Sequence, residues 1–277
     1  MNLLDILKVV VMGIVEGFTE WLPISSTGHM ILVDELLQLD MRPEFKEVFL
    51  KVIQCGAMLA IVALYFRRLN PFSPRKSGEQ KKATWKLWGK IVLACIPAAV
   101  VGLLADDWVD EHLYNGLVVS LTLIIYGILF IVIENVNKYK EPYIDRIGKL
   151  DYLTAFYIGL FQVLSIIPGT SRSGATILGA MLLGCSRSVS AEFSFYLGVP
   201  VIFGASLIKL LKFGFDFTGY EIAYLIIGMV SAFFVAIYSV KFLIEWVKKN
   251  DFRFFGYYRI VLGVIVLIWY GVSQLLA

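Results

Sequence analysis

Long apolar blocks separated by short polar segments make up most of the chain. Six of them approach or exceed the about 20 mostly apolar residues that a membrane-spanning helix needs. They lie near residues 48–66, 87–105, 116–134, 190–211, 220–243 and 257–276. Two further apolar stretches, 2–37 and 152–184, are interrupted by polar residues and prolines. The pattern predicts an all-α polytopic membrane protein, with residues 1–277 forming a single membrane domain.

The two interrupted stretches resemble each other. EGFTEWLPISSTGH (16–29) and FQVLSIIPGTSRSGAT (161–176) each hold an apolar run, a proline and a cluster of small polar residues, and the prolines are 145 residues apart. We expect each half to contain one re-entrant helical hairpin plus three transmembrane helices. An odd number of crossings would invert the second half. The sequence therefore predicts an inverted repeat, with repeat one at 1–140 and repeat two at 150–277.

Basic residues are concentrated in alternate loops. Segment 67–90 has eight Lys or Arg residues and one acid, whereas 106–115 has neither Lys nor Arg. Segments 135–151 and 245–259 are basic again, and Arg259 is counted in the latter. Cytoplasmic loops carry the excess of positive charge, so we expect 67–90 inside and both termini outside. This explains the net charge of +3 without a nucleic-acid partner. The N-terminal run lacks a basic flank and a cleavage site, so we expect it to be retained.

Several residue types carry no predicted chemistry. The three cysteines lie in apolar blocks without metal-ligand spacing and are interpreted as packing residues. His112 falls in the acidic outer segment and is assigned no role. Aromatic residues near the predicted interfaces are expected to form a belt at the headgroup level, and none is given a catalytic meaning: Trp85, Trp88, Trp246, Tyr257 and Tyr258.

Two carboxylates interrupt the first apolar stretch. Glu16 and Glu20 are four residues apart and share a face of a helix. Acids inside an apolar segment are costly and usually functional, although a short helix could instead place them in the headgroup layer. Oxygen ligands suit Mg²⁺ or Ca²⁺, so the pair is a candidate divalent-cation site. One acid could alternatively transfer a proton.

Each hairpin is predicted to turn at its proline and to start a new helix. The helix N-terminus is a natural anion site, because its free N–H groups and dipole favour negative charge. Two such ends converging would form a phosphate cradle. The candidate caps and diphosphate contacts are small hydroxyl residues after Pro23 and Pro168, namely Ser25, Ser26 and Thr27, and Thr170 and Ser171.

Arg172 and His29 lie inside these motifs. A buried Arg needs an anionic partner, and its planar fork matches phosphate oxygens; a salt bridge to Glu16, Glu20 or Glu192 is the alternative. His29 follows Ser26 by one helical turn, so the two side chains can face one site. Gln54 and Glu192 are polar residues on the following spans, and each could line the pocket or join helices.

At these two motifs the chain resembles the undecaprenyl-diphosphate phosphatase family, the bacitracin-resistance type of bacterial inner membranes. The resemblance covers nearly the whole chain. It implies a pocket facing the periplasm, a requirement for a divalent cation, and hydrolysis of a polyprenyl diphosphate lipid to the monophosphate and phosphate, which recycles the carrier for cell-wall synthesis. The family motifs mark Glu16, Glu20, Ser26, His29, Ser171, Arg172, Ser173 and Thr176.

The combined interpretation assigns catalysis to Glu16, Glu20, Ser26, His29 and Arg172. Ser26 would attack the terminal phosphorus while His29 handles its proton; a metal-activated water is the competing nucleophile. A lipid-phosphate flippase would use the same inverted-repeat site and is the main alternative function. The unrelated lipid phosphatases with a histidine nucleophile fit less well, because their basic motif is not found here. A homodimer is a further expectation.

Overall fold

The computed structural model describes residues 2–214 and 216–276, most of which are helical, and no strand lies within those ranges. Among the described residues, six helices are long and apolar enough to cross a membrane. They are α3 with α4 (Pro43–Val52 and Gln54–Leu64), α6 (Gly78–Leu113), α7 (Gly116–Asn137), α10 (Arg187–Phe213), α11 (Gly219–Lys249) and α12 (Arg253–Leu276). The predicted polytopic helical fold is confirmed.

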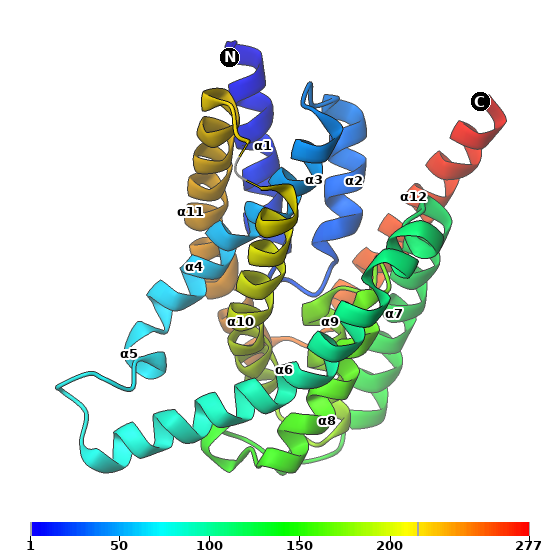
Figure 1. Cartoon of the computed structure of the whole chain (residues 1–277). Coiled ribbons are helices and arrows are strands. Elements are labelled where there is room, and N and C mark those ends of the chain that lie inside the picture. The colour runs from blue at the N-terminus through cyan, green and yellow to red at the C-terminus, as the bar shows by residue number, and fades with distance from the viewer. Residues whose placement is uncertain (1, 215, 277) are drawn as a thin grey trace.

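Shorter helices form the two hairpins. α1 (Leu3–Thr19) and α2 (Ser26–Leu37) make the first, and α8 (Tyr152–Val163) and α9 (Arg172–Leu182) make the second. A 3₁₀ turn, η2 (Leu164–Ile166), lies between α8 and α9 in the second hairpin. The short helix α5 (Phe66–Leu69) and a second 3₁₀ turn, η1 (Ile147–Lys149), lie in the segments that connect the remaining elements. Both chain ends lie at one end of the molecule, and α5 and the start of α8 lie at the other, so the hairpins enter from opposite ends (Figure 1). Each half has one hairpin and three spans; the inverted repeat stays a prediction.

The predicted halves interlock. α1 packs along α11, α8 along α6, and α7 along α12, so each pair joins one half to the other. Small residues permit the close approach: a Cβ at Gly17 would lie 2.3 Å from the Ala232 oxygen, and one at Gly159 would lie 2.2 Å from the Ala94 oxygen. Glycine at the helix interface is a common way to bring membrane helices together. The hairpins are therefore held in place by long helices of the opposite half.

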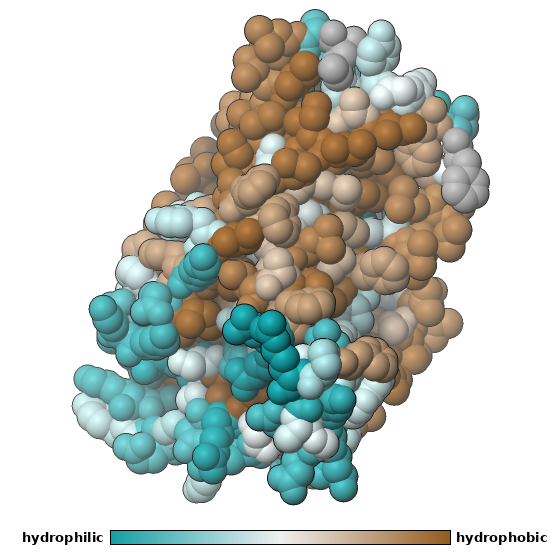
Figure 2. Space-filling view, turned by 90° about the vertical axis from the view of Figure 1, so that its left-hand side faces the viewer, coloured by the Kyte–Doolittle hydropathy of each residue, from teal (hydrophilic) through white to brown (hydrophobic). Residues whose placement is uncertain are grey.

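The surface has the polarity that a bilayer requires. Hydrophilic residues gather near the end that holds α5 and the start of α6, and an apolar band covers much of the rest (Figure 2). Large apolar side chains such as Phe203, Phe234 and Ile268 are more than half exposed. Exposed apolar surface on this scale is typical of a lipid-facing protein rather than a soluble one. The chain is thus a multi-pass membrane protein.

Helix boundaries differ from the apolar blocks in three places. α6 begins at Gly78, where the side chains of Ser77 and Gln80 form a capping box, and continues to Leu113. Residues 78–90 and most of 106–115 are therefore helical rather than loop. α12 begins at Arg253, so Arg259 lies inside a helix and is fully buried. Counting Arg259 in the polar segment 245–259 was wrong, because helix boundaries follow capping and packing as well as hydropathy.

Candidate active site

The two hairpin tips use the same backbone device. Ser25 and Ser171 are the N-caps of α2 and α9, with φ of 72° and 71°. Their hydroxyl oxygens accept hydrogen bonds from the N–H groups of Gly28 (3.3 Å) and Gly174 (3.2 Å). Positive φ is strained for a residue other than glycine and is concentrated at functional sites. The predicted caps are confirmed at these two serines, and both helix N-termini begin at the tips.

The second tip also needs a glycine. Gly169 has φ of +85°, and a Cβ there would lie 2.2 Å from the Thr122 hydroxyl oxygen. That hydroxyl donates to the Pro168 carbonyl at 2.7 Å. Only glycine combines this conformation with so close an approach. The tip is thereby fixed against α7.

Direct hydrogen bonds join the two tips. The Ser173 hydroxyl lies 3.1 Å from the Leu22 carbonyl oxygen and 3.3 Å from that of Glu20. Arg259 of α12 donates to the carbonyls of Pro23 (3.3 Å), and of Gly169 and Thr170 (2.9 Å each). Arg259 thus bonds to the carbonyls of both loops and holds them at a fixed separation.

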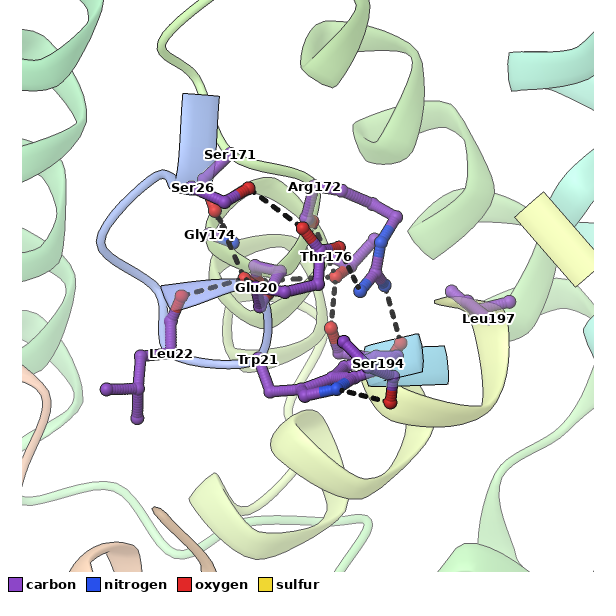
Figure 3. Close-up of polar contacts among 12 residues, drawn as sticks. Glu20, Trp21, Leu22, Ser26, Ser171, Arg172, Gly174, Thr176, Ser194 and Leu197 are labelled. Atoms are coloured by element: carbon purple, nitrogen blue, oxygen red, sulfur yellow. Dashed lines mark hydrogen bonds and ion pairs between the residues drawn. The ribbon is translucent and has the colours of Figure 1, made fainter. Parts of the chain in front are cut away.

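Glu20 lies at the centre of the site. One carboxylate oxygen accepts the Ser26 hydroxyl at 2.8 Å, and the other lies 3.4 Å from a terminal nitrogen of Arg172 (Figure 3). Glu20 is 8% exposed and the Arg172 side chain 9%. The contacts join the first hairpin to the second, so three of the five predicted catalytic residues converge. The salt-bridge alternative for Arg172 is present, and it involves the predicted site itself.

Aromatic and backbone groups hold the Arg172 guanidinium. It lies over the Trp21 ring, 4.9 Å from the centroid, and donates to the Ser194 carbonyl at 2.8 Å. The slot is narrow, because a Cβ at Gly198 would lie 2.8 Å from a terminal nitrogen of Arg172. The Thr176 hydroxyl bonds to the Ser194 hydroxyl at 2.7 Å and so links α9 to α10. This packing fixes the orientation of the planar guanidinium.

Glu16 is fully buried on α1, and neither of its carboxylate oxygens has a hydrogen-bond partner among the described residues. The charge of Glu20 repels a negative charge on Glu16, and the charge of Lys51 attracts it. A buried carboxylate without a partner is costly, and a cation would supply the partner that is missing. The residues therefore fit a divalent cation held by Glu16 and Glu20 through oxygen ligands.

His29 lies one turn into α2. Its Nδ1 is 2.7 Å from the Ser25 carbonyl oxygen, and its Nε2 is 2.7 Å from the Tyr258 hydroxyl. The Ser26 hydroxyl meanwhile donates to Glu20. The structure thus gives Ser26 a carboxylate partner, where the sequence predicted a histidine.

The remaining predicted site residues occupy the tips or lie apart from them. Ser171 and Ser173 are 3.1 Å apart through their hydroxyls, Thr170 is fully buried, and Thr27 is half-buried at the start of α2. Gln54 is half-buried at the start of α4. Glu192 accepts hydrogen bonds from Arg68 and Tyr196, which joins the α5 region to α10. Of the two roles considered for Glu192, these contacts favour the one that joins helices.

Sequence reasoning missed two residues of α12. Tyr258 was assigned to an interfacial belt and Arg259 to a loop, yet they contact His29 and the hairpin tips respectively. One signal was available for Arg259, since the apolar run IVLGVIVLIWY follows it directly. A charge at the edge of an apolar run can mark either a loop or a buried contact. For Tyr258 the sequence offers no comparable signal.

The chain matches known proteins over nearly its whole length. A family model described as "Bacitracin resistance protein BacA" matches residues 9–265. The chain is 56% identical over 277 residues to an undecaprenyl-diphosphatase of Desulfitobacterium hafniense, covering all of both chains. It is 56% identical to proteins of the same name from Enterococcus faecalis (94% of this chain, 95% of the relative) and Lactiplantibacillus plantarum (96% and 98%).

Proposed function

The chain belongs to the bacitracin resistance protein BacA family and is an undecaprenyl-diphosphatase, and we propose that hydrolysis takes place between its two hairpin tips. One observation carries this assignment. Glu20 contacts both Ser26 and Arg172 where the N-termini of α2 and α9 meet. An acid, a hydroxyl and a guanidinium beside two helix N-termini supply the positioning and charge stabilisation that phosphoryl transfer requires.

Arg172 binds the diphosphate in this proposal. Its fork can pair with two phosphate oxygens at once, and the Trp21 ring and the Ser194 carbonyl already orient it. The hydroxyls and free N–H groups at the starts of α2 and α9 add further donors. They come from Ser25, Ser26, Thr27, Thr170 and Ser171. The hydroxyls of Ser173 and Thr176 already donate to the Leu22 carbonyl and to Ser194, so these two residues hold the site together.

Ser26 attacks the terminal phosphorus. Its Oγ forms a bond to phosphorus, the bridging P–O bond breaks, and undecaprenyl phosphate leaves. The Ser26 proton passes to Glu20, because the 2.8 Å hydrogen bond already points at that carboxylate. In the second step the water oxygen bonds to phosphorus and the Ser26 Oγ–P bond breaks. Glu20 returns its proton to Ser26 Oγ, one water proton leaves with inorganic phosphate as its hydroxyl, and the other passes to a base other than Glu20. Glu20 therefore replaces His29 as the group that takes the Ser26 proton.

A divalent cation, Mg²⁺ or Ca²⁺, fits the acid pair. Glu16 and Glu20 would hold it, and a bound cation would neutralise phosphate charge near Arg172. Glu16 supports this assignment because its buried carboxylate has no partner of its own among the described residues.

The proposed setting is the bacterial inner membrane, with the site open toward the outside. The basic residues of 67–90 support this orientation, since such segments stay in the cytoplasm. Figure 1 shows both chain ends at the opposite end of the molecule. The substrate is the lipid diphosphate within the bilayer. A homodimer is part of the proposal and is testable by cross-linking in membranes.

Phosphate release and a trapped intermediate together test this mechanism. Purified detergent-solubilised protein is given undecaprenyl diphosphate with and without EDTA, and released phosphate is measured. We expect steady release that EDTA abolishes and that excess Mg²⁺ or Ca²⁺ restores. Acid quench should then trap a phosphoserine on the peptide that contains Ser26. Release without any phosphoserine would favour a water nucleophile, and EDTA-resistant release would remove the cation from the proposal.

A further inference from the structure

Tyr258 of α12 contacts His29 of the first hairpin although the two lie 229 positions apart in the chain. The Tyr258 hydroxyl is 2.7 Å from His29 Nε2. The two rings are also stacked, with centroids 5.6 Å apart and planes inclined by 8°. Tyr258 is 39% exposed, so the pair lies at the margin of the site rather than in the core.

The other ring nitrogen settles which proton His29 carries. Nδ1 lies 2.7 Å from the Ser25 carbonyl oxygen, and a carbonyl can only accept. Nδ1 of the neutral ring therefore carries the hydrogen. Nε2 then has the only lone pair, and the Tyr258 hydroxyl donates to it. The basic atom of His29 is therefore Nε2, and it accepts a hydrogen bond from the Tyr258 hydroxyl.

We propose that Tyr258 is a positioning residue of the phosphatase, which keeps His29 neutral and its Nε2 ready to accept a proton. The inference rests on the proposed function. Glu20 takes the Ser26 proton, so His29 is left for the proton of the water that cleaves the phosphoserine. In that step the water replaces the Tyr258 hydroxyl at Nε2. The water O–H bond breaks as its oxygen bonds to phosphorus, and the proton goes to His29 Nε2. The Ser26 Oγ–P bond breaks, and Oγ takes the proton held on Glu20.

The variant Tyr258→Phe isolates the hydroxyl, because it keeps the ring that stacks on His29. We expect kcat to fall about tenfold while KM stays within about twofold, since substrate binding does not use this hydroxyl. Tyr257→Phe is the matched control. It removes the same group one position away, from a side chain that is 57% exposed, and it should turn over like the unaltered protein. Wild-type kcat in Tyr258→Phe would overturn the proposal.

A double-mutant cycle tests whether Tyr258 acts through His29. If it does, adding Tyr258→Phe to a His29→Ala protein should lower kcat no further. A second tenfold loss in that background would show that Tyr258 acts elsewhere, and would refute the positioning role.

Nitrogen NMR reads the pairing without any turnover. The chain has only two histidines, so His112→Gln leaves His29 as the single imidazole signal. We expect Nδ1 protonated and Nε2 unprotonated, with the Nε2 resonance moving downfield in Tyr258→Phe. A protonated Nε2 at neutral pH, or an unmoved resonance, would contradict the pairing. If unaltered protein released no phosphate, the proposed function would fail, whereas the spectrum would still decide the pairing.

Discussion

The first hairpin brings two carboxylates, a serine hydroxyl and a histidine to the tips, whereas the second brings a guanidinium and small hydroxyls. Their backbones are alike: Ser25 and Ser171 cap their helices with nearly equal positive φ. The side chains that line up differ. When the two hairpins are aligned on Ser25 and Ser171, Glu16 occupies the position that corresponds to Gln162. Both side chains are fully buried, and in each the two polar side-chain atoms have no hydrogen-bond partner among the described residues. The backbone conformation that the two tips share determines where the side chains meet. The first hairpin supplies negative charge there, and the second supplies positive charge.

Removing a hydroxyl from each tip gives the largest expected contrast. Ser26→Ala should lower kcat at least about thousandfold, or ~4 kcal/mol, because the nucleophile is lost. Ser171→Ala should lower activity no more than about tenfold, since that hydroxyl caps α9 and bonds to Ser173, and a lost cap costs about 1 kcal/mol. Phosphate release with undecaprenyl diphosphate measures both. Equal losses of activity in the two variants would contradict the assignment of Ser26 as the nucleophile and Ser171 as a helix cap.

Arg172→Lys tests the second hairpin's charge. We expect a loss of at least about tenfold in kcat/KM, or ~1.4 kcal/mol, because an ammonium cannot reproduce the bidentate fork. It would also lose the stacking on Trp21 that orients the group. Thermal unfolding of the variant in detergent serves as the folding control. Near-normal turnover would mean that charge alone suffices at this position.

Matched changes at Glu16 and Gln162 test the acid of the first hairpin. Glu16→Gln should raise the cation concentration for half-maximal activity at least about fivefold, or ~1 kcal/mol, because the amide lacks the charge that a metal needs. Gln162→Leu should leave the cation requirement unchanged. Titration of Mg²⁺ or Ca²⁺ after EDTA treatment measures both. A normal titration in Glu16→Gln would exclude Glu16 as a ligand.

The sequence predicted the features that depend on local signals. Span lengths follow from apolar runs, and the hairpin tips follow from Pro23 and Pro168 with the serines behind them. Contacts across the fold could not be predicted in the same way. Ser26 reaches Glu20 because the chain turns back between them, and a spacing of six residues matches no helical face. Helical spacing instead favoured His29 as the partner of Ser26, because it lies one turn further along the helix.

Arg259 shows the same limit more clearly. Its acceptors are carbonyls at Pro23, Gly169 and Thr170, two of them in the second tip and one in the first. Every residue has a backbone carbonyl, so the sequence does not indicate which carbonyls accept the hydrogen bonds of Arg259. The sequence therefore supplies the parts of each hairpin, and the packing of α12 decides how they meet.

The contact between Arg172 and Glu20 leads to the prediction with the smallest expected effect, which is also the most specific. Arg172 lies 3.4 Å from Glu20, so a phosphate that binds Arg172 competes with that carboxylate for the guanidinium. Removing the charge in Glu20→Gln should tighten phosphate binding about threefold, or ~0.6 kcal/mol, although hydrolysis is lost. Calorimetry with inorganic phosphate in EDTA measures the affinity, and Glu192→Gln, at a carboxylate that pairs with Arg68, is the control. A weaker affinity in Glu20→Gln would mean that this carboxylate organises the anion site rather than competing with it, and the two hairpins would then act as one binding unit.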